Sequence, residues 1–346
     1  MGAIFLKTFV ILAALMLFAV PGLVLKKLNM LGDGAKTTLG NILLYVCQPA
    51  LIISSFTVFS DADYETIRSY DRVALLADFG VAAAVSTVAI LAMFALCKAV
   101  FVRYKDRPAA DVYTFIAMFS NCGFLGVPFV EMFTDGNAVA VLYVMVFNLV
   151  FAVLAWTLGV YLITHDAHDV SPKKVLLNPT VIATAVAVVM FFVPEINFFM
   201  IDGCKELGTV PSALGTMTAP ISMILVGVAL AELPVRSLFD KSGIYVAGAL
   251  RLVVAPLVTF GIAVAFKYMT AGGVAAHPDG EYVFLAPVLA MCMPPAAIIV
   301  AMTERFGKAK ELAAAAYVSD TLFSLVSAPL MILCVTELWE LVALCY

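Results

Sequence analysis

Two apolar segments, one in each half of the chain, are interrupted by helix-breaking residues at matching places. The first runs from Tyr113 to Pro128, and the second runs from Tyr282 to Pro295. Both open with Tyr-x-Phe, then Ile or Leu, then Ala. Lipid offers no water to unpaired backbone groups, so a broken helix persists in a membrane only where protein or a water-filled cavity surrounds the break. Paired breaks in the two halves of a membrane chain are the best sequence indication of a transport site.

The composition indicates that lipid is the solvent for most of the chain. Of 346 residues, 64% are hydrophobic and 13% are charged, and the mean hydropathy is +1.06. Soluble domains are about half apolar and about a quarter charged. The net charge of −4 comes with no basic tract or metal-ligand spacing, so we expect no nucleic-acid partner, no metal and no organic cofactor. No hydrolase motif accompanies the apolar runs, so we expect no enzyme.

The apolar runs predict an all-α integral membrane protein with ten transmembrane helices. A membrane-spanning helix needs about 20 apolar residues, and the connections between the ten runs are short and polar. The predicted spans are residues 3–25, 38–59, 73–97, 111–132, 138–163, 175–194, 212–233, 243–267, 282–303 and 311–336.

The distribution of Lys and Arg between the loops predicts the orientation. One side carries fourteen of them, namely Lys26, Lys27, Lys36, Lys98, Arg103, Lys105, Arg107, Lys173, Lys174, Arg236, Lys241, Arg305, Lys308 and Lys310. The other side carries five, namely Lys7, Arg68, Arg72, Lys205 and Lys267. Cytoplasmic loops are enriched in these residues, so both termini are expected outside the cytoplasm, in a multi-pass protein of the cell membrane.

The number of spans predicts an inverted repeat. Each half holds five spans, and two tandem halves with an odd number of spans insert with opposite topology. We therefore expect a first repeat over residues 1–165 and a second, inverted repeat over residues 175–346.

The run from Ser120 to Pro128 resembles the auxin efflux carrier family, the PIN-like transporters of prokaryotes and plants, whose fourth span carries N-x-G-F-L-G-x-P. Pro49, the run from Thr218 to Pro220 and the run from Arg251 to Pro256 also look like this family. The resemblance implies a fold similar to sodium/proton antiporters and bile-acid symporters, in which helices 4 and 9 cross at their breaks. It further implies a scaffold of helices 1, 2, 6 and 7, a moving transport domain of helices 3–5 and 8–10, and a homodimer through the scaffold.

The resemblance also implies a substrate class. Members of this family carry mostly small organic anions such as auxin, malate or malonate. The chain departs from the family in Cys122, in Ile298 and Ile299 after the prolines of the ninth span, and in Asp320, where relatives carry other residue types. The substrate and the coupling ion therefore do not carry over.

We interpret the chain as a secondary active transporter of a small carboxylate or dicarboxylate, working by elevator-type alternating access. The N-terminal end of a half-helix carries partial positive charge and can hold a carboxylate, and glycines allow close backbone approach. The candidate binding residues are Asn121, Cys122, Gly123, Gly126, Pro128, Pro294 and Pro295. The alternative is a proline kink satisfied by neighbouring helices.

Further polar residues within the apolar runs could take part. Gln48 and Thr218 precede prolines and either line the pathway or satisfy backbone groups at a kink. Asp78, Arg251 and Asp320 are costly in lipid unless they pair, face water or are neutralised. Arg251 and Asp78 could form a structural ion pair, and Asp320, near Asn148, could bind H⁺ or Na⁺ as the coupling ion.

Two other functions remain open. The chain could be a Na⁺- or H⁺-coupled transporter of a neutral or inorganic substrate, with Asp78 and Asp320 as ion ligands. It could also be a transporter-like sensor that binds a ligand without moving it.

Overall fold

The computed structural model describes residues 2–32, 34–166, 177–201, 203–270 and 274–344. Lys173, Lys174 and the predicted start of the second repeat at 175 lie outside these ranges. The regular secondary structure of the described ranges is helical. Its α-helices are α1 (Gly2–Leu17), α2 (Ala19–Lys27), α3 (Ala35–Ile42), α4 (Gln48–Thr57), α5 (Asp61–Ser69), α6 (Arg72–Val100), α7 (Arg107–Met118), α8 (Val127–Phe133), α9 (Ala138–Leu154), α10 (Val160–Thr164), α12 (Pro179–Phe192), α13 (Thr209–Thr216), α14 (Thr218–Glu232), α15 (Ser242–Ala249), α16 (Ala255–Met269), α17 (Tyr282–Met291), α18 (Ile298–Phe306) and α19 (Lys310–Leu344).

Seven helical stretches among the described residues are long and apolar enough to cross a membrane. They are Gly2–Lys27, Ala35–Thr57, Arg72–Arg103, Ala138–Thr164, Lys205–Glu232, Ser242–Met269 and Lys310–Val342. The other three predicted spans, the fourth, sixth and ninth, contain shorter apolar helices, which are Cys122–Phe133, Pro179–Phe192 and Tyr282–Met291. Over the described ranges the protein is thus all-helical with seven candidate membrane spans, and the ten-helix repeat stays a prediction.

Three of the long stretches and the shorter helix Cys122–Phe133 each contain one wide π-helical turn, and three of these four turns lie just before a proline. The turns η1 (Leu43–Cys47), η3 (Cys122–Gly126) and η9 (Leu250–Val254) are each followed two residues later by Pro49, Pro128 or Pro256. Proline has no N–H and its ring clashes with the carbonyl four residues earlier. A wider turn accommodates that ring while the helix continues.

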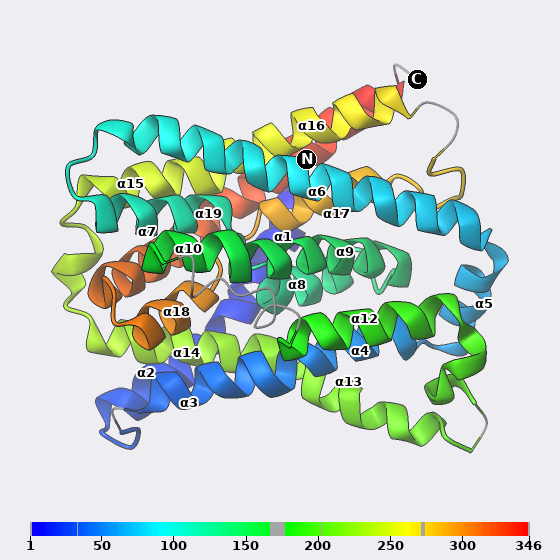
Figure 1. Cartoon of the computed structure of the whole chain (residues 1–346), viewed down its shortest axis with the longest axis horizontal. Helices are drawn as coiled ribbons and strands as arrows, with labels where there is room; N and C mark the ends of the chain where they lie inside the picture. The colour runs from blue at the N-terminus through cyan, green and yellow to red at the C-terminus, as the bar shows by residue number, and fades with distance from the viewer. Residues whose placement is uncertain (1, 33, 167–176, 202, 271–273, 345–346) are drawn as a thin grey trace.

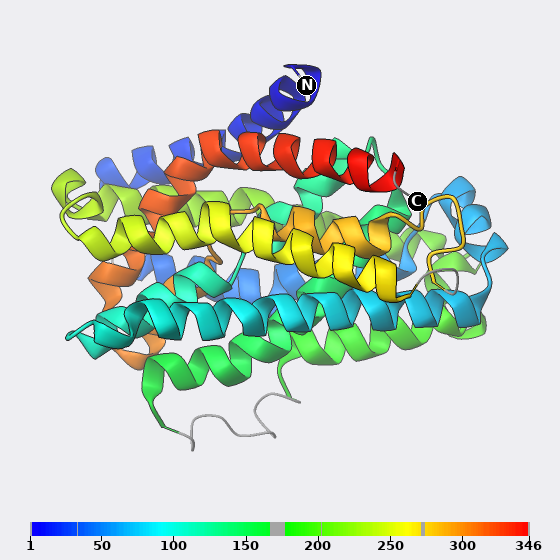
Figure 2. The same cartoon turned by 90° about the horizontal axis from the view of Figure 1, so that it is seen from above.

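The helices run roughly along the long axis of the molecule and form two groups (Figure 1). Helices α2, α3, α4, α12, α13 and α14 lie along the lower part of that view, and α6, α7, α9, α10 and α15 to α19 lie above them. Helix α2 packs against α14, and α4 packs against α12 and α13, whereas α17 packs against α6, α9 and α16. Seen from above, the start of α1 projects beyond the other helices (Figure 2).

Glycines set the closest helix contact of the lower group. A Cβ added at Gly22 of α2 would overlap the Ile224 carbonyl of α14, and one added at Gly227 would overlap the Ala19 carbonyl. Small residues allow membrane helices to approach backbone to backbone, and dispersion contacts then hold the pair together.

Candidate functional site

The two interrupted segments meet through their backbones. Helix α7 ends at Met118 and helical structure resumes at Cys122, while α17 ends at Met291 and α18 begins at Ile298. The Asn121 N–H donates to the Pro294 carbonyl at 2.7 Å, and the Ala296 N–H donates to the Phe119 carbonyl at 2.9 Å. Ser120 and Pro295 thereby form an isolated antiparallel bridge. Each interruption supplies partners for backbone groups that the other leaves unpaired, as an apolar environment requires.

The first interruption does not lie at Pro128, where the sequence suggested it. Residues Phe119 to Asn121 leave the helix, and Pro128 sits in the first turn of α8, behind the π turn. Pro294 and Pro295 do lie in the second interruption. The two segments differ in whether their prolines break the helix. The π turn η3 accommodates Pro128, whereas the consecutive prolines Pro294 and Pro295 remove two adjacent N–H donors.

A small pocket of about 10 Å³ lies at this junction. Its lining comes from both interruptions and from two neighbouring helices, and consists of Gln48, Ser120, Asn121, Gly123, Phe124, Asn148, Phe151, Ala296, Ala297 and Ile298. Four of the predicted site residues are therefore brought together: Gln48, Asn121, Gly123 and Asn148. A cavity of this volume holds about one water molecule, so a larger guest requires the walls to move.

The pocket presents hydrogen-bond donors that have no protein partner. The Nδ2 atoms of Asn121 and Asn148 and the Ser120 hydroxyl are buried and lack a hydrogen-bond partner among the described residues. The Cys122 thiol donates to Asn148 Oδ1 at 3.5 Å, which leaves the amide N–H groups of Asn148 free. Buried polar groups are normally hydrogen-bonded, so unpaired amide donors facing one pocket suit an oxygen-rich guest.

Gly123 allows this arrangement. A Cβ added at Gly123 would lie 2.6 Å from Asn148 Oδ1, so a larger residue would displace the Asn148 amide. Gly126 packs against the Met293 side chain, 3.3 Å from an added Cβ, behind the junction. Thr218 is buried with an unpartnered hydroxyl but does not line the pocket.

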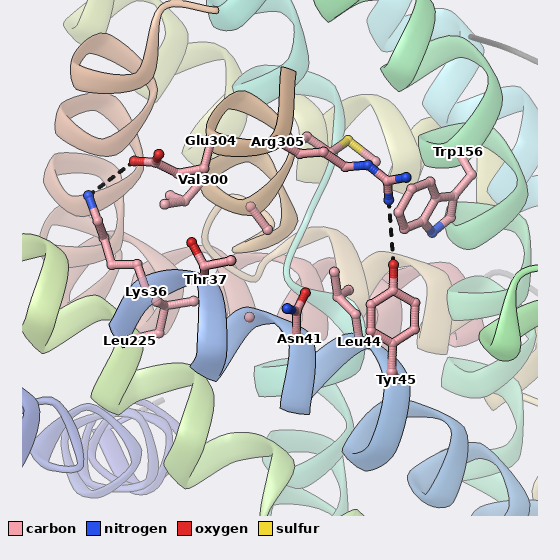
Figure 3. A pocket seen from close by; sticks show the side chains of 13 residues that line it. Lys36, Thr37, Asn41, Leu44, Tyr45, Trp156, Leu225, Val300, Glu304 and Arg305 are labelled. Atoms are coloured by element: carbon pink, nitrogen blue, oxygen red, sulfur yellow. Dashed lines mark hydrogen bonds and ion pairs between the residues drawn. The ribbon is translucent and has the colours of Figure 1, made fainter. Parts of the chain in front are cut away.

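A second cavity of about 420 Å³ lies between α3 and α18 (Figure 3). Leu44 in its wall is one helical turn from Gln48, and Val300 is close in sequence to Ile298, so the two cavities share two wall segments. The cavity is lined by Lys36, Thr37, Gly40, Asn41, Leu44, Tyr45, Trp156, Leu225, Val300, Ala301, Met302, Glu304 and Arg305.

Two polar contacts bridge this larger cavity. Lys36 Nζ lies 3.2 Å from Glu304 Oε1, and Lys36 also pairs with Glu232 at 2.7 Å. On the other side, Arg305 Nη1 donates to the Tyr45 hydroxyl at 3.4 Å (Figure 3). Both contacts join α3 and the turn that follows it to α18, on opposite sides of the cavity (Figure 3).

Arg251 is fully buried and lies against the ends of both interrupted helices. Its guanidinium donates to the Ala117 carbonyl at 3.2 Å and to the Met291 carbonyl, and these carbonyls belong to the last turns of α7 and α17. The final carbonyls of a helix lack intrahelical partners and carry partial negative charge. Arg251 therefore neutralises two helix ends at once.

The suggested ion pair between Arg251 and Asp78 is wrong. Asp78 Oδ1 accepts the Ala275 N–H at 2.8 Å, and its Oδ2 lies 3.2 Å from His277 Nε2 and 3.4 Å from the Tyr143 hydroxyl. These partners belong to the loop before α17 and to α9. Sequence reasoning missed His277 because it stands far from Asp78 in the chain and within a polar loop.

Asp320 is buried on α19, and neither of its carboxylate oxygens has a hydrogen-bond partner among the described residues. A Cβ added at Gly248 of α15 would lie 2.6 Å from Asp320 Oδ1. Asp320 and Asn148, which we expected near each other, have different neighbours: Asn148 contacts Cys122 and Gly123 instead.

Comparison with known proteins places the chain in a family. The comparison with curated proteins gives no significant match. A family model described as membrane transport protein matches residues 7–172 and again residues 163–332. Since these two matches cover most of the sequence, the chain belongs to the membrane transport protein family, the family of the auxin efflux carriers and PIN-like transporters.

Proposed function

We propose that the chain is a secondary active transporter of a small organic anion, a carboxylate or dicarboxylate. The observation that carries the proposal is the junction of the two interruptions, where unpaired amide donors of Asn121 and Asn148 line one pocket. A carboxylate offers two oxygens and accepts about four hydrogen bonds, which matches these donors. Carboxylates cross lipid poorly, and fixed dipoles at the junction replace the water they leave.

The charge distribution favours an anion over a cation at this junction. Gly123 and Ile298 lie in the first turns of the helices that follow the interruptions, and both line the pocket. Helix N-termini favour negative charge. The opposite helix ends, which favour cations, are already neutralised by Arg251.

The transport cycle follows from the proposed division of the chain. Helices 1, 2, 6 and 7 form the scaffold, and helices 3–5 and 8–10 form a transport domain that slides against it. The larger cavity has α3 of the scaffold on one side and α18 and Trp156 of the transport domain on the other (Figure 3). Elevator-type transport requires such a gap between the scaffold and the transport domain, so that one can move against the other.

The cavity also suggests which side is open. Lys36, Glu304 and Arg305 in its wall lie at the end of the molecule that we assign to the cytoplasm. A substrate would enter there, pass Leu44 and Val300, and reach Gln48 and Asn121. We further propose a homodimer through the scaffold, with both termini outside the cytoplasm of the cell membrane.

Uptake by purified protein in proteoliposomes tests the proposal. The panel consists of radiolabelled mono- and dicarboxylates, each with and without imposed pH and sodium gradients, and protein-free liposomes set the background. We expect at least one carboxylate to accumulate. Sodium-driven uptake of a neutral or inorganic solute alone would favour the first alternative, and carboxylate binding without uptake would favour the sensor.

A further inference from the structure

Arg251 and Asp320 are two buried charges that lie near each other without forming an ion pair. The Nε atom of Arg251 and both oxygens of Asp320 are buried and unpartnered among the described residues. Gly248 touches Asp320 and stands one helical turn before Arg251 on the same continuous helix. Both α15 and the turn η9, which carries Arg251, pack against α19, so the two charged residues are neighbours across this helix contact.

The surroundings of Asp320 offer few other charges. Of the elements packed against this part of α19, α15 presents Gly248, and the turn η8 (Val235–Leu238) presents the Leu238 carbonyl, which accepts a hydrogen bond from Ser319. Four ionisable groups of these elements and of α7 face other partners: Asp111 pairs with Lys98 and His165, Tyr113 lies against Tyr104 and Gly243, Tyr245 donates to the Phe239 carbonyl, and Arg236 pairs with Asp240. Arg107, at the start of α7, is exposed. Other titratable groups in this region of the described chain are Tyr317, on α19 itself, and the thiols of Cys97, Cys122 and Cys292 around Arg251.

We propose that Asp320 binds the proton that travels with the anion, and that Arg251 links this proton to the anion pocket. This inference rests on the proposed function. A proton from water adds to one Asp320 oxygen and forms an O–H bond, which removes one negative charge beside Arg251. The positive charge of Arg251 is then offset only by the carbonyls at the ends of α7 and α17, so the junction attracts an anion more strongly.

The coupling works in both directions. If protonation of Asp320 tightens anion binding, anion binding must favour protonation of Asp320 by the same factor. A carboxylate and a proton would therefore load and unload together, as a symporter requires.

The same surroundings favour a proton over a sodium ion. A sodium ion needs several oxygen ligands, and the hydroxyls on either side of Asp320 are held at backbone carbonyls instead: Ser319 donates to the Leu238 carbonyl at 2.8 Å and Thr321 to the Tyr317 carbonyl at 2.7 Å. Arg251 also repels a metal cation, whereas a single proton neutralises the carboxylate without needing further ligands.

Uptake of radiolabelled malonate and malate at acidic and neutral pH tests the proposal with Asp320→Asn. In the wild type we expect uptake to rise at acidic pH on the order of tenfold, within the usual range of coupling between two sites. Asp320→Asn, a neutral isostere, should give equal uptake at both pH values and no accumulation driven by a pH gradient. Malonate and malate ionise to the same extent at a given pH whichever protein is used. A difference in pH dependence between the wild type and Asp320→Asn therefore comes from the protein.

Asp78→Asn is the matched control, because Asp78 is as fully buried as Asp320. It should keep the pH dependence of the wild type. Unchanged pH dependence in Asp320→Asn, or its loss in Asp78→Asn alone, overturns the proposal.

Infrared difference spectroscopy measures the proton itself and separates the two proposals. The wild type should show the carbonyl stretch of a protonated carboxylic acid that titrates with pH and is missing in Asp320→Asn. If this band is present but no carboxylate of the panel moves at any pH, the proposed function fails while the proton site stands. If carboxylates move and the band is absent, the proton site is wrong and the proposed function stands.

Discussion

The backbone N–H of Asn121 donates to the carbonyl of Pro294 at 2.7 Å, although the two residues belong to opposite halves of the chain. Together with the bond from Ala296 to Phe119, this contact joins the two interrupted segments into one local structure. The Asn121 side chain is thereby fixed at the edge of the pocket by its own backbone, while its Nδ2 remains unpartnered among the described residues.

Asn121→Ala should strongly weaken carboxylate binding and uptake while the protein still folds. Loss of a hydrogen bond to a charged guest costs about 1.5–3 kcal/mol, which corresponds to a roughly ten- to hundredfold drop in affinity. The melting temperature should change little, because the Nδ2 atom has no protein partner to lose. Proteoliposome uptake and a thermal melt in detergent measure the two effects. Asn41→Ala, in the larger cavity, is the control and should reduce uptake less than Asn121→Ala does. If Asn121→Ala took up carboxylates at the wild-type rate, Asn121 would not belong to the binding site.

Gly248→Ala should destabilise the protein although alanine is the better helix former. The new methyl would lie 2.6 Å from Asp320 Oδ1, and overpacking of a tight interior costs about 1–3 kcal/mol. Gly261→Ala is a matched control further along the same helical stretch, where an added Cβ meets nothing within 4 Å. That change should stabilise by roughly 0.4–1 kcal/mol. Equal melting temperatures for the two variants would show that the space at Gly248 is not needed.

Gly227→Ala should weaken the packing of α2 against α14. An added methyl overlaps the Ala19 carbonyl, which belongs to the backbone and cannot rotate away. We expect a loss of about 2 kcal/mol or more, since overpacking against a backbone forces the two helices apart. Thermal unfolding in detergent checks the loss. Gly80→Ala, in open space on α6, should be neutral or stabilising, and a similar loss there would contradict the packing argument.

Asp78→Ala should loosen the loop before α17. The Ala275 N–H loses its acceptor and His277 loses a neighbour; because Ala275 is partly buried, the cost should fall toward the low end of the roughly 1–3 kcal/mol of a buried unsatisfied donor. Hydrogen–deuterium exchange at Ala275 should accelerate accordingly. Asp61→Ala is the control, because Asp61 is 87% exposed and its bond to Lys205 is worth about 0–1 kcal/mol at most. Unaltered exchange at Ala275 would show that Asp78 does not hold the loop.

The sequence by itself determined the class of protein. Apolar content and run lengths require a lipid environment, and the Ser120 to Pro128 motif indicated the family that the comparison then showed. These inferences succeed because composition and the length of apolar runs can be read along the chain. They do not depend on which residues are in contact in the folded protein. The same holds for Asn121 and Gly123 as pocket residues, since both belong to one short motif.

The tertiary structure decided the pairings between distant residues. Sequence could not show that Asp78 meets His277, that Arg251 spans the ends of α7 and α17, or that Asp320 lies against Gly248. The sequence also pointed to Pro128 as the break in the first segment, whereas the structure has it at Phe119 to Asn121. A π turn that accommodates a proline has no sequence signature of its own, so this shift could not be predicted. Buried charges choose partners by three-dimensional proximity, and in an all-helical chain that proximity depends on how each helix is rotated and shifted against its neighbours.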